Sequence, residues 1–399
     1  MNASSVPVPT FNLSRQLEHY VAGHSSANHR LPLAVESLEI AAQHRMSAEN
    51  YEWVAGSAGN GDAARENVRA FERWRIMPRM LTDISAPDLT VQLGKATIPA
   101  PFLLAPIGVQ QAAHVDGEKA TARGAATAGW PMMVSTVSTF PMETVAEAAP
   151  EADLWYQLYW SSDPELNRSL LNRAKIAGYR AVVVTLDTQR LGWREGNLQH
   201  GFLPFLRKVG VANYLADPVF QARLPRAVED CSDEEVAKLY FEVYSDLTHT
   251  WKDLQEIREA TDLPVWVKGI QHPDDVPLAL EQGMDGVIVS NHGGRQVAGG
   301  IATLDALPEV ARAVDGHVPI LFDSGIRRGA DAFKALALGA DAVLIGRPFM
   351  WALAVGGETG VADYLQNFRT DFELTMTLSG RSRVQDIVRE DLRRIGASS

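Results

Sequence analysis

The sequence predicts an α/β protein built on a (β/α)8 barrel, also called a TIM barrel. Apolar runs of four or five residues recur between residues 102 and 345, and most precede a stretch with helical periodicity. Continuous apolar strands that alternate with amphipathic helices indicate a parallel sheet covered by helices. Eight such units fit a closed barrel of about 250 residues. An open, doubly wound sheet is the alternative, but no G-x-G-x-x-G motif follows the first strand, so the barrel is favoured.

The chain before the barrel is expected to form helices and a hairpin. Residues 35–74 have helical periodicity, and residues 85–99 have the pattern of a short hairpin. We therefore expect residues 1–99 to pack as an extension on a barrel of residues 100–399. The predicted barrel strands are residues 102–105, 131–135, 154–158, 181–185, 264–268, 286–290, 318–322 and 341–345.

One interval breaks the alternation of strands and helices. Residues 186–263 separate the fourth strand from the fifth and are far longer than an ordinary βα connection. They include "GFLPFLRKVGVANYLADPVF" and a helix expected near residues 233–259. An insertion after the carboxyl end of a barrel strand lies beside the active site, so residues 195–262 are predicted to form a lid.

Composition excludes several classes of partner. The 399 residues carry a formal net charge of −12, which disfavours nucleic acid and anionic membranes because both repel an acidic protein. The single cysteine, Cys231, permits no intrachain disulfide and suits the reducing cytoplasm. Its acidic neighbours, "EDCSDEE", favour a structural or surface position. No signal peptide or membrane span is evident, so a cytoplasmic protein is expected.

Polar residues follow almost every predicted strand. The active site of a (β/α)8 barrel lies at the carboxyl ends of its strands. One such residue alone has a structural explanation, whereas a series of them predicts one large polar ligand across the barrel mouth. The strand ends carry the polar residues Ser135, Gln157, Tyr159, Thr185, Asp187, Lys268, Ser290, Asn291, His292, Asp323 and Arg347, together with Pro106, Ile107, Gly108, Gly325 and Gly346.

The last two loops predict a phosphate site. "FDSGIRRGADAF" places glycines and Arg327 just before a helix, and "IGRPF" adds Arg347. The loops after strands seven and eight bind phosphate in many proteins of this fold, because free N–H groups and the helix dipole face the anion. Arginine side chains add charge-assisted hydrogen bonds. Ordinary turn glycines and a helix cap are the alternative reading.

A second cluster predicts the chemistry. Arg194 and Arg295 suit bidentate recognition of a carboxylate, and His292 with Asp187 suits a general base of fixed tautomer. Lys268 favours negative charge that develops nearby. These residues predict proton removal beside a carboxylate while a phosphate-bearing cofactor accepts electrons. No metal ion is expected.

The motifs "SNHGGRQ", "LDTQRLGWRE", "VKGI", "FDSGIRRGADAFKALALGA" and "IGRP" resemble the FMN-dependent 2-hydroxy acid oxidases and dehydrogenases. The resemblance extends from about residue 35 to the C-terminus. Within this family, "VAGSAG", "MPRML", "APIGV", "NYLADPVFQ" and "KGIQHPDD" are most similar to the lactate 2-monooxygenases.

The resemblance implies roles for individual residues. His292 is the base, Asp187 orients it, and Lys268 lies against the flavin N1/O2 edge and stabilises the reduced anion. Arg194 and Arg295 hold the substrate carboxylate, Tyr159 lies near the hydroxyl, and Tyr214 closes over the substrate. The implied FMN-binding residues are Pro106, Ile107, Gly108, Ser135, Gln157, Thr185, Lys268, Ser290, Asp323, Gly325, Arg327, Gly346 and Arg347.

One position departs from the family pattern. A tyrosine on the N-terminal helix helps to bind the substrate carboxylate in the family, and Trp53 in "YEWVAGSAG" occupies that position here. Indole offers one donor and no acceptor on a bulkier ring. Trp53 is expected either to reach the carboxylate or to reshape the pocket for another substrate. Tyr51 should point to a different side of the helix and cannot replace it.

The implied reaction is the oxidation of a small L-2-hydroxy acid to the 2-oxo acid with O2 as electron acceptor. In a lactate 2-monooxygenase the coupled products of lactate and O2 are acetate, CO2 and water, whereas an oxidase releases the oxo acid and peroxide. Three alternatives stay open: a quinone-linked dehydrogenase with "FLPFLRKVG" against a membrane, an enzyme for a larger hydroxy acid, and an FMN-binding protein without activity. A homotetramer or octamer is expected from the resemblance.

Overall fold

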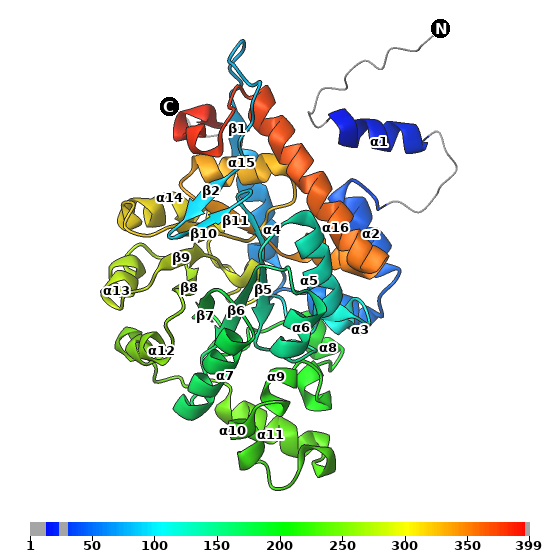
Figure 1. The fold of residues 1–399 in the computed structure, drawn as a ribbon, viewed down its shortest axis with the longest axis vertical. Coiled ribbons are helices and arrows are strands. Elements are labelled where there is room, and N and C mark those ends of the chain that lie inside the picture. Colours follow the sequence, from blue (N-terminus) through cyan, green and yellow to red (C-terminus); the bar gives the residue numbers. More distant parts are fainter. Residues whose placement is uncertain (1–12, 24–30, 396–399) are drawn as a thin grey trace.

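A closed barrel of eight parallel strands forms the centre of the computed structural model, which describes residues 13–23 and 31–395 (Figure 1). All eight predicted strands are confirmed, with boundaries that differ by one or two residues. The strands are β4 (Phe102–Leu104), β5 (Met132–Ser135), β6 (Leu154–Tyr159), β7 (Val182–Thr185), β8 (Val265–Ile270), β9 (Gly286–Val289), β10 (Ile320–Phe322) and β11 (Ala342–Ile345).

The strands form because each one is apolar on both faces. One set of alternate residues makes a separate buried cluster that fills the barrel, and the other set packs under the helices. Trp155 and Trp266 lie side by side in the inner cluster, with ring centroids 5.3 Å apart. The parallel register pairs Tyr159 with Thr185 and Thr185 with Lys268. Polar residues that end different strands are therefore brought to one rim.

Helices cover the outside of the barrel. Asp163 caps α7 by accepting hydrogen bonds from the amides of Glu165 and Leu166, and Pro164 fixes its first turn. The covering helices are α5 (Gly117–Ala128), α6 (Met142–Ala148), α7 (Pro164–Ile176), α13 (Asp275–Glu281), α14 (Thr303–Val314), α15 (Gly329–Ala337) and α16 (Arg347–Leu378). In the described part of the chain, no helix has both the length and the apolar character of a membrane span. The cytoplasmic location and the oligomeric state stay predictions.

The N-terminal extension contains the expected helices and hairpin. It comprises α1 (Leu13–Gly23), α2 (Val35–Gln43), α3 (Ala48–Ala55), α4 (Asp62–Arg69), η1 (Ala70–Arg73), β1 (Trp74–Ile76), β2 (Val91–Leu93) and β3 (Ala96–Ile98). The sequence did not predict that β1 pairs antiparallel with β12 (Leu392–Arg394), which joins the N-terminal extension to the C-terminal end of the described chain. Arg389 and Arg394 lie over the Trp74 ring at this junction.

The insertion is a group of short helices rather than one long helix. The single helix predicted for residues 233–259 is wrong, because the chain leaves the helix between α11 and α12. Asp246 accepts a hydrogen bond from the Thr248 amide at 2.8 Å, and Thr250 and Asp253 form a capping box. Such bonds satisfy the backbone outside a helix. The elements are α8 (Glu195–Gln199), η3 (Pro204–Arg207), α9 (Ala212–Leu215), α10 (Pro218–Arg223), η4 (Val228–Asp230), α11 (Asp233–Val243), η5 (Trp251–Asp253) and α12 (Leu254–Ala260).

Short 3-10 turns complete the chain. They are η2 (Gln110–Ala112), η6 (His292–Gly294), η7 (Val384–Asp386) and η8 (Arg389–Asp391). The turn η6 directly follows β9 and carries the histidine that the sequence singled out. Cys231 is buried with its Sγ atom 3.5 Å from the carbonyl oxygen of Arg226, which fits a structural role.

Candidate active site

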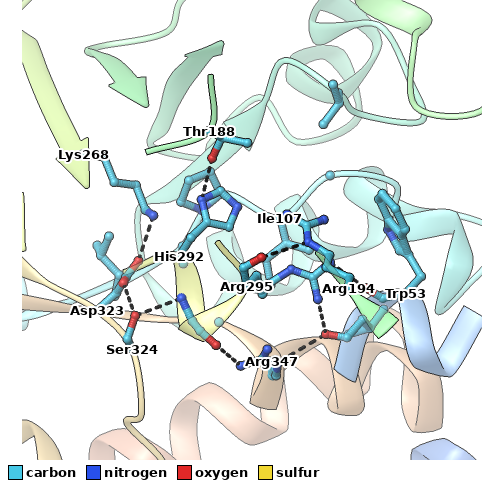
Figure 2. Close-up of a pocket in the computed structure, with 18 of the residues that line it drawn as sticks. Trp53, Ile107, Thr188, Arg194, Lys268, His292, Arg295, Asp323, Ser324 and Arg347 are labelled. Atoms are coloured by element: carbon cyan, nitrogen blue, oxygen red, sulfur yellow. Dashed lines mark hydrogen bonds and ion pairs between the residues drawn. The ribbon is translucent and has the colours of Figure 1, made fainter. Parts of the chain in front are cut away.

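A cavity lies at the carboxyl ends of the barrel strands (Figure 2). It brings together most of the residues that the sequence predicted for the site. Those that line it are Trp53, Pro106, Ile107, Gly108, Tyr159, Arg194, Lys268, His292, Arg295, Asp323, Gly325, Arg327, Gly346 and Arg347.

Six residues that the sequence predicts at the strand ends do not line the cavity: Ser135, Gln157, Thr185, Asp187, Ser290 and Asn291. Ser135 donates a hydrogen bond to Gln157 Oε1 at 2.8 Å, and both side chains are buried. Ser290 accepts a hydrogen bond from Lys268 Nζ at 2.7 Å. Thr185 is also buried and faces a smaller neighbouring cavity.

The structure joins Asp187 to His292. His292 Nδ1 lies 2.9 Å from Asp187 Oδ1. The Thr188 hydroxyl donates to the same carboxylate oxygen at 2.8 Å and lies 3.1 Å from His292 Nδ1. The spacing along the chain could not establish this contact, because it joins the loops after β7 and β9.

The loop that carries His292 adopts an unusual backbone conformation. His292 has φ +57°, and Gly293 and Gly294 also have positive φ. Left-handed backbone at a residue other than glycine carries strain that the surroundings must hold. Here Asn291 Oδ1 accepts a hydrogen bond from the Gly294 amide, and Asn67 and Asn291 exchange two amide hydrogen bonds of 2.8 Å. The extension therefore fixes the histidine loop.

Burial and charge set the protonation of this pair. Burial lowers the pKa of His292, Asp187 raises it, and Lys268 and Arg194 lower it, so that it lies below its ordinary value of 6.5. Burial would raise the pKa of Asp187, but His292, Lys268 and the hydrogen bond from Thr188 bring it to about 2. At neutral pH a neutral imidazole therefore lies beside an ionised carboxylate.

Three arginines line the cavity, Arg194 buried and Arg295 and Arg347 partly buried, and none has a carboxylate partner among the described residues. Among the described residues, the guanidinium groups of Arg194, Arg295 and Arg347 donate only to carbonyl and amide oxygens. Burial lowers the pKa of all three, and that of Arg347 falls to about 10. Buried charge that no counter-ion neutralises is costly, so the cavity is suited to anions.

Helix α3 supplies most of the acceptors for two of these arginines. Arg295 donates to the carbonyl oxygens of Trp53 at 2.9 Å and Gly56 at 2.6 Å. Arg347 donates to the carbonyl oxygens of Val54 at 3.2 Å and Gly56 at 2.9 Å. These carbonyls belong to the end of a helix, where they lack intrahelical partners. The N-terminal extension thus orients two cations of the site.

A fourth cation lies deeper at the barrel mouth. Lys268 Nζ is 3.3 Å from Asp323 Oδ2, and both side chains are buried. Burial lowers the pKa of Lys268, but Asp323 and Asp187 raise it by more, so the net shift is upward. The amine is therefore charged, and Figure 2 shows it pointing toward Asp323 on the same side of the site as His292.

In the loop after β10, Gly325 packs closely against the backbone of Asn67. Gly325 has φ +90°, and a Cβ there would lie 2.2 Å from the carbonyl oxygen of Asn67, so a side chain cannot be accommodated. The Arg327 and Arg328 amides donate to Asp331 Oδ2 at the start of α15. Burial lowers the pKa of the Arg327 guanidinium. This loop and Arg347 form the predicted phosphate region.

Trp53 lies in the cavity wall. Its ring packs edge-on against Phe202 and Phe205, with centroid distances of 6.2 Å and 5.7 Å, and the Arg295 guanidinium lies 5.9 Å from its ring. Tyr51 stacks on Trp351 instead, and its hydroxyl donates to Glu39. The expectation that Tyr51 points elsewhere is confirmed.

Tyr214 lies away from the cavity. Its fully buried ring packs between Phe220 and Tyr240, with centroid distances of 5.5 Å and 5.1 Å. The expectation that Tyr214 closes over a substrate is not supported by this geometry, because its ring belongs to the core of the insertion. Phe205, from the same insertion, lines the cavity instead.

Sequence reasoning missed several residues of the site. Val137, Thr188, Leu191, Phe205 and Tyr244 line the cavity. Thr188 follows Asp187 directly, and this adjacency was the one signal that could have identified it. The apolar residues of the cavity could not be recognised in the sequence, because residues of the same types also form the core.

Comparison with known proteins establishes the family. The FMN-dependent dehydrogenase family matches residues 42–394. The chain belongs to this family. An L-lactate oxidase of Lysinibacillus sphaericus is 42% identical over 356 residues, which cover 89% of this chain and 91% of that protein. The 2-hydroxyacid oxidase 1 of Mus musculus is 40% identical over 339 residues, 84% of this chain and 90% of that protein.

Solved structures agree with the sequence comparison. A crystal structure of mandelate oxidase has a TM-score of 0.80 and 34% identity, and the match covers 91% of this chain and 98% of that one. As a member of this family, the protein is an FMN-dependent oxidoreductase that oxidises 2-hydroxy acids.

The cavity fits FMN. Within the described residues, buried Gln157 Nε2 has no hydrogen-bond partner and can donate to an acceptor on a flavin ring. Gly325, Arg327 and Arg347 line the cavity together, and the two guanidinium groups offer charge to a phosphate.

Proposed function

We propose that the protein oxidises a small L-2-hydroxy acid, such as L-lactate, to the 2-oxo acid with dioxygen as the electron acceptor. One observation carries the proposal. His292, which burial and charge keep neutral beside ionised Asp187, lines the same cavity as Arg194 and Arg295, which have no carboxylate partner among the described residues. A base and an anion site in one enclosed space suit a substrate with an acidic proton near a carboxylate.

Arg194 and Arg295 would bind the substrate carboxylate. Each retains N–H groups beyond those that donate to carbonyl and amide oxygens, and neither is neutralised by an acid among the described residues. Burial raises the pKa of Tyr159, so its phenol stays protonated and can donate to the substrate hydroxyl. These contacts would fix the orientation of the carbon that loses hydrogen.

His292 would take the proton. Its Nδ1 atom is occupied by Asp187, which leaves Nε2 as the atom that accepts. The carboxylate then stabilises the imidazolium that forms. Lys268 would stabilise negative charge that develops beside it in the cavity.

When bound, FMN would supply the two-electron oxidation, with dioxygen as the final electron acceptor. Overall, the hydroxy acid loses two electrons and two protons, and dioxygen gains them as hydrogen peroxide. We assign Arg327, Arg347, Gly325 and Gly346 to the phosphate, and Asp323 to the ribityl chain. The residues assigned to the ring are Pro106, Ile107, Gly108, Ser135, Gln157, Thr185, Lys268 and Ser290.

The apolar residues of the cavity would contact the side chain of the substrate. Trp53, Val137, Leu191, Phe205 and Tyr244 line it. The indole of Trp53 is bulkier than the usual tyrosine, and it favours a short aliphatic side chain over an aromatic one. An aromatic acid is the second candidate, because solved relatives bind mandelate and its analogues. Phe205 belongs to residues 195–262 and lines the cavity, which supports the proposal that this insertion forms a lid.

The test is anaerobic mixing of the FMN-loaded protein with L-lactate, D-lactate or mandelate while the flavin absorbance is followed. L-Lactate should bleach the flavin fastest. Faster bleaching by mandelate would favour the aromatic candidate, and no bleaching by any acid would refute the proposal. Air is then admitted and the products are measured. Pyruvate with peroxide indicates an oxidase, acetate with CO2 a coupled monooxygenase, and a reduced flavin that persists in air a quinone-linked dehydrogenase.

A further inference from the structure

Gln296 joins the two loops that carry the polar groups of the site. It follows Arg295 in the loop after β9. Its Oε1 atom accepts hydrogen bonds from Arg194 Nη2 at 2.7 Å and from the Gly192 amide at 3.3 Å. Its Nε2 atom donates to the carbonyl oxygens of Asp187 at 2.7 Å and Arg190 at 2.8 Å. One side-chain amide therefore binds the loop after β7 at both of its ends.

The two loops also pack tightly where this amide lies. A Cβ on Gly192 would come within 2.4 Å of the Arg295 carbonyl oxygen and 2.6 Å of the Gln296 carbonyl oxygen. Arg194 Nε donates to the same Arg295 carbonyl at 3.2 Å. Two residues of the loop after β9, Arg295 and Gln296, therefore fix the direction of the Arg194 guanidinium.

The neutrality of the amide matters as much as its position. An amide oxygen holds Arg194 without cancelling its charge, whereas a carboxylate at the same place would form an ion pair with it. Gln296 does not line the cavity and has no place in the catalytic step. Its influence on a substrate must pass through Arg194 and Asp187.

We propose that Gln296 is a positioning residue that sets the affinity of the site for carboxylates. Through Oε1 it holds Arg194 as a free cation, and through Nε2 it fixes the backbone of Asp187 beside the histidine. The inference rests on the proposed function, since it assigns the substrate carboxylate to Arg194.

The test compares Gln296→Glu and Gln296→Met with Gln189→Glu in the FMN-loaded protein. Gln189 is an exposed residue of the same loop that lies outside the main cavity, so its variant controls for an added carboxylate. The first probe is oxalate, an unreactive dianion whose binding is followed through the flavin absorbance. The second is anaerobic flavin reduction by L-lactate, which separates the half-saturating concentration from the limiting rate.

Gln296→Glu should raise the dissociation constant of oxalate and the half-saturating lactate concentration by about 10- to 100-fold, because its carboxylate pairs with Arg194 and weakens the attraction of that cation for a bound carboxylate. Gln296→Met should raise both values less, because it places no negative charge beside Arg194. Both variants should lower the limiting rate, since neither side chain can donate to the Asp187 carbonyl oxygen. Gln189→Glu should match the wild type. Equal values for all three variants would overturn the proposal.

A second comparison separates positioning from a general structural effect. If Gln296 acts through Arg194, Gln296→Glu should change oxalate binding little when Arg194 is already methionine. Full additivity of the two substitutions would contradict the proposal. If oxalate binding follows the expected pattern but no hydroxy acid bleaches the wild-type flavin, the proposed reaction fails while the role of Gln296 stands.

Discussion

Replacement of Asp187 by asparagine tests the histidine–carboxylate pair. The ion pair that forms after proton transfer joins His292 Nδ1 and Asp187 Oδ1 at 2.9 Å. With an effective dielectric constant of about 20, its Coulomb energy has a ceiling of about 6 kcal/mol. Asparagine keeps a neutral hydrogen bond worth about 1 kcal/mol, and Thr188 remains in place. A loss of about 3–5 kcal/mol is expected.

That loss corresponds to a fall of roughly 10²- to 10⁴-fold in the limiting rate of flavin reduction, measured by anaerobic rapid mixing with L-lactate. The FMN content should not change, because Asp187 lies behind the histidine and does not line the main cavity. Thr188→Val is the control, since it keeps the carboxylate and removes one neutral hydrogen bond. It should cost about fivefold.

Two results would refute this reasoning. One is a limiting rate for Asp187→Asn within about fivefold of the wild type, which would mean that the carboxylate does not stabilise the imidazolium. The other is a greater loss for Thr188→Val than for Asp187→Asn, which would make the hydroxyl the principal partner of His292.

Three further predictions follow from the same geometry. The limiting reduction rate should fall as pH decreases through the pKa of His292, which lies below 6.5, because only the neutral imidazole accepts a proton; a profile that is flat down to pH 4 would contradict this. Arg347→Met should weaken FMN binding by about 10- to 100-fold but leave riboflavin binding nearly unchanged, as measured by titration with each flavin. Equal losses of affinity for the two flavins would show that Arg347 does not bind the phosphate. Gly294→Ala should destabilise the fold by about 2–4 kcal/mol in thermal unfolding, because φ is +75° and the new Cβ would lie 2.5 Å from the Ala64 amide; an unchanged midpoint would show that α4 can move.

The fold was largely predictable because its signals are local. Each barrel strand is a continuous apolar run, and the order of strands and helices then determines the topology. The pairing of β1 with β12 joins Trp74 to Arg394 across most of the chain, and no local pattern marks it. The break before α12 depended on side-chain bonds of Asp246 and Thr250, which a count of helix-forming residues does not detect.

The candidate site was predictable where a rule assigns positions. Residues that end barrel strands must meet at one rim, and this rule identified His292 and Lys268. The insertion follows no such rule, and there the sequence favoured Tyr214 when Phe205 lines the cavity. The role of α3 was hidden for another reason. Its backbone carbonyls hold Arg295 and Arg347, and backbone atoms leave no trace in residue identity.

The central claim is that His292 removes the proton that initiates oxidation. Anaerobic mixing of His292→Ala with L-lactate tests it most directly, alongside the wild type. We expect the His292→Ala protein to be yellow and to bind FMN and oxalate like the wild type, but we expect no bleaching of its flavin by lactate. Bleaching of His292→Ala at the wild-type rate would contradict the assignment of the base.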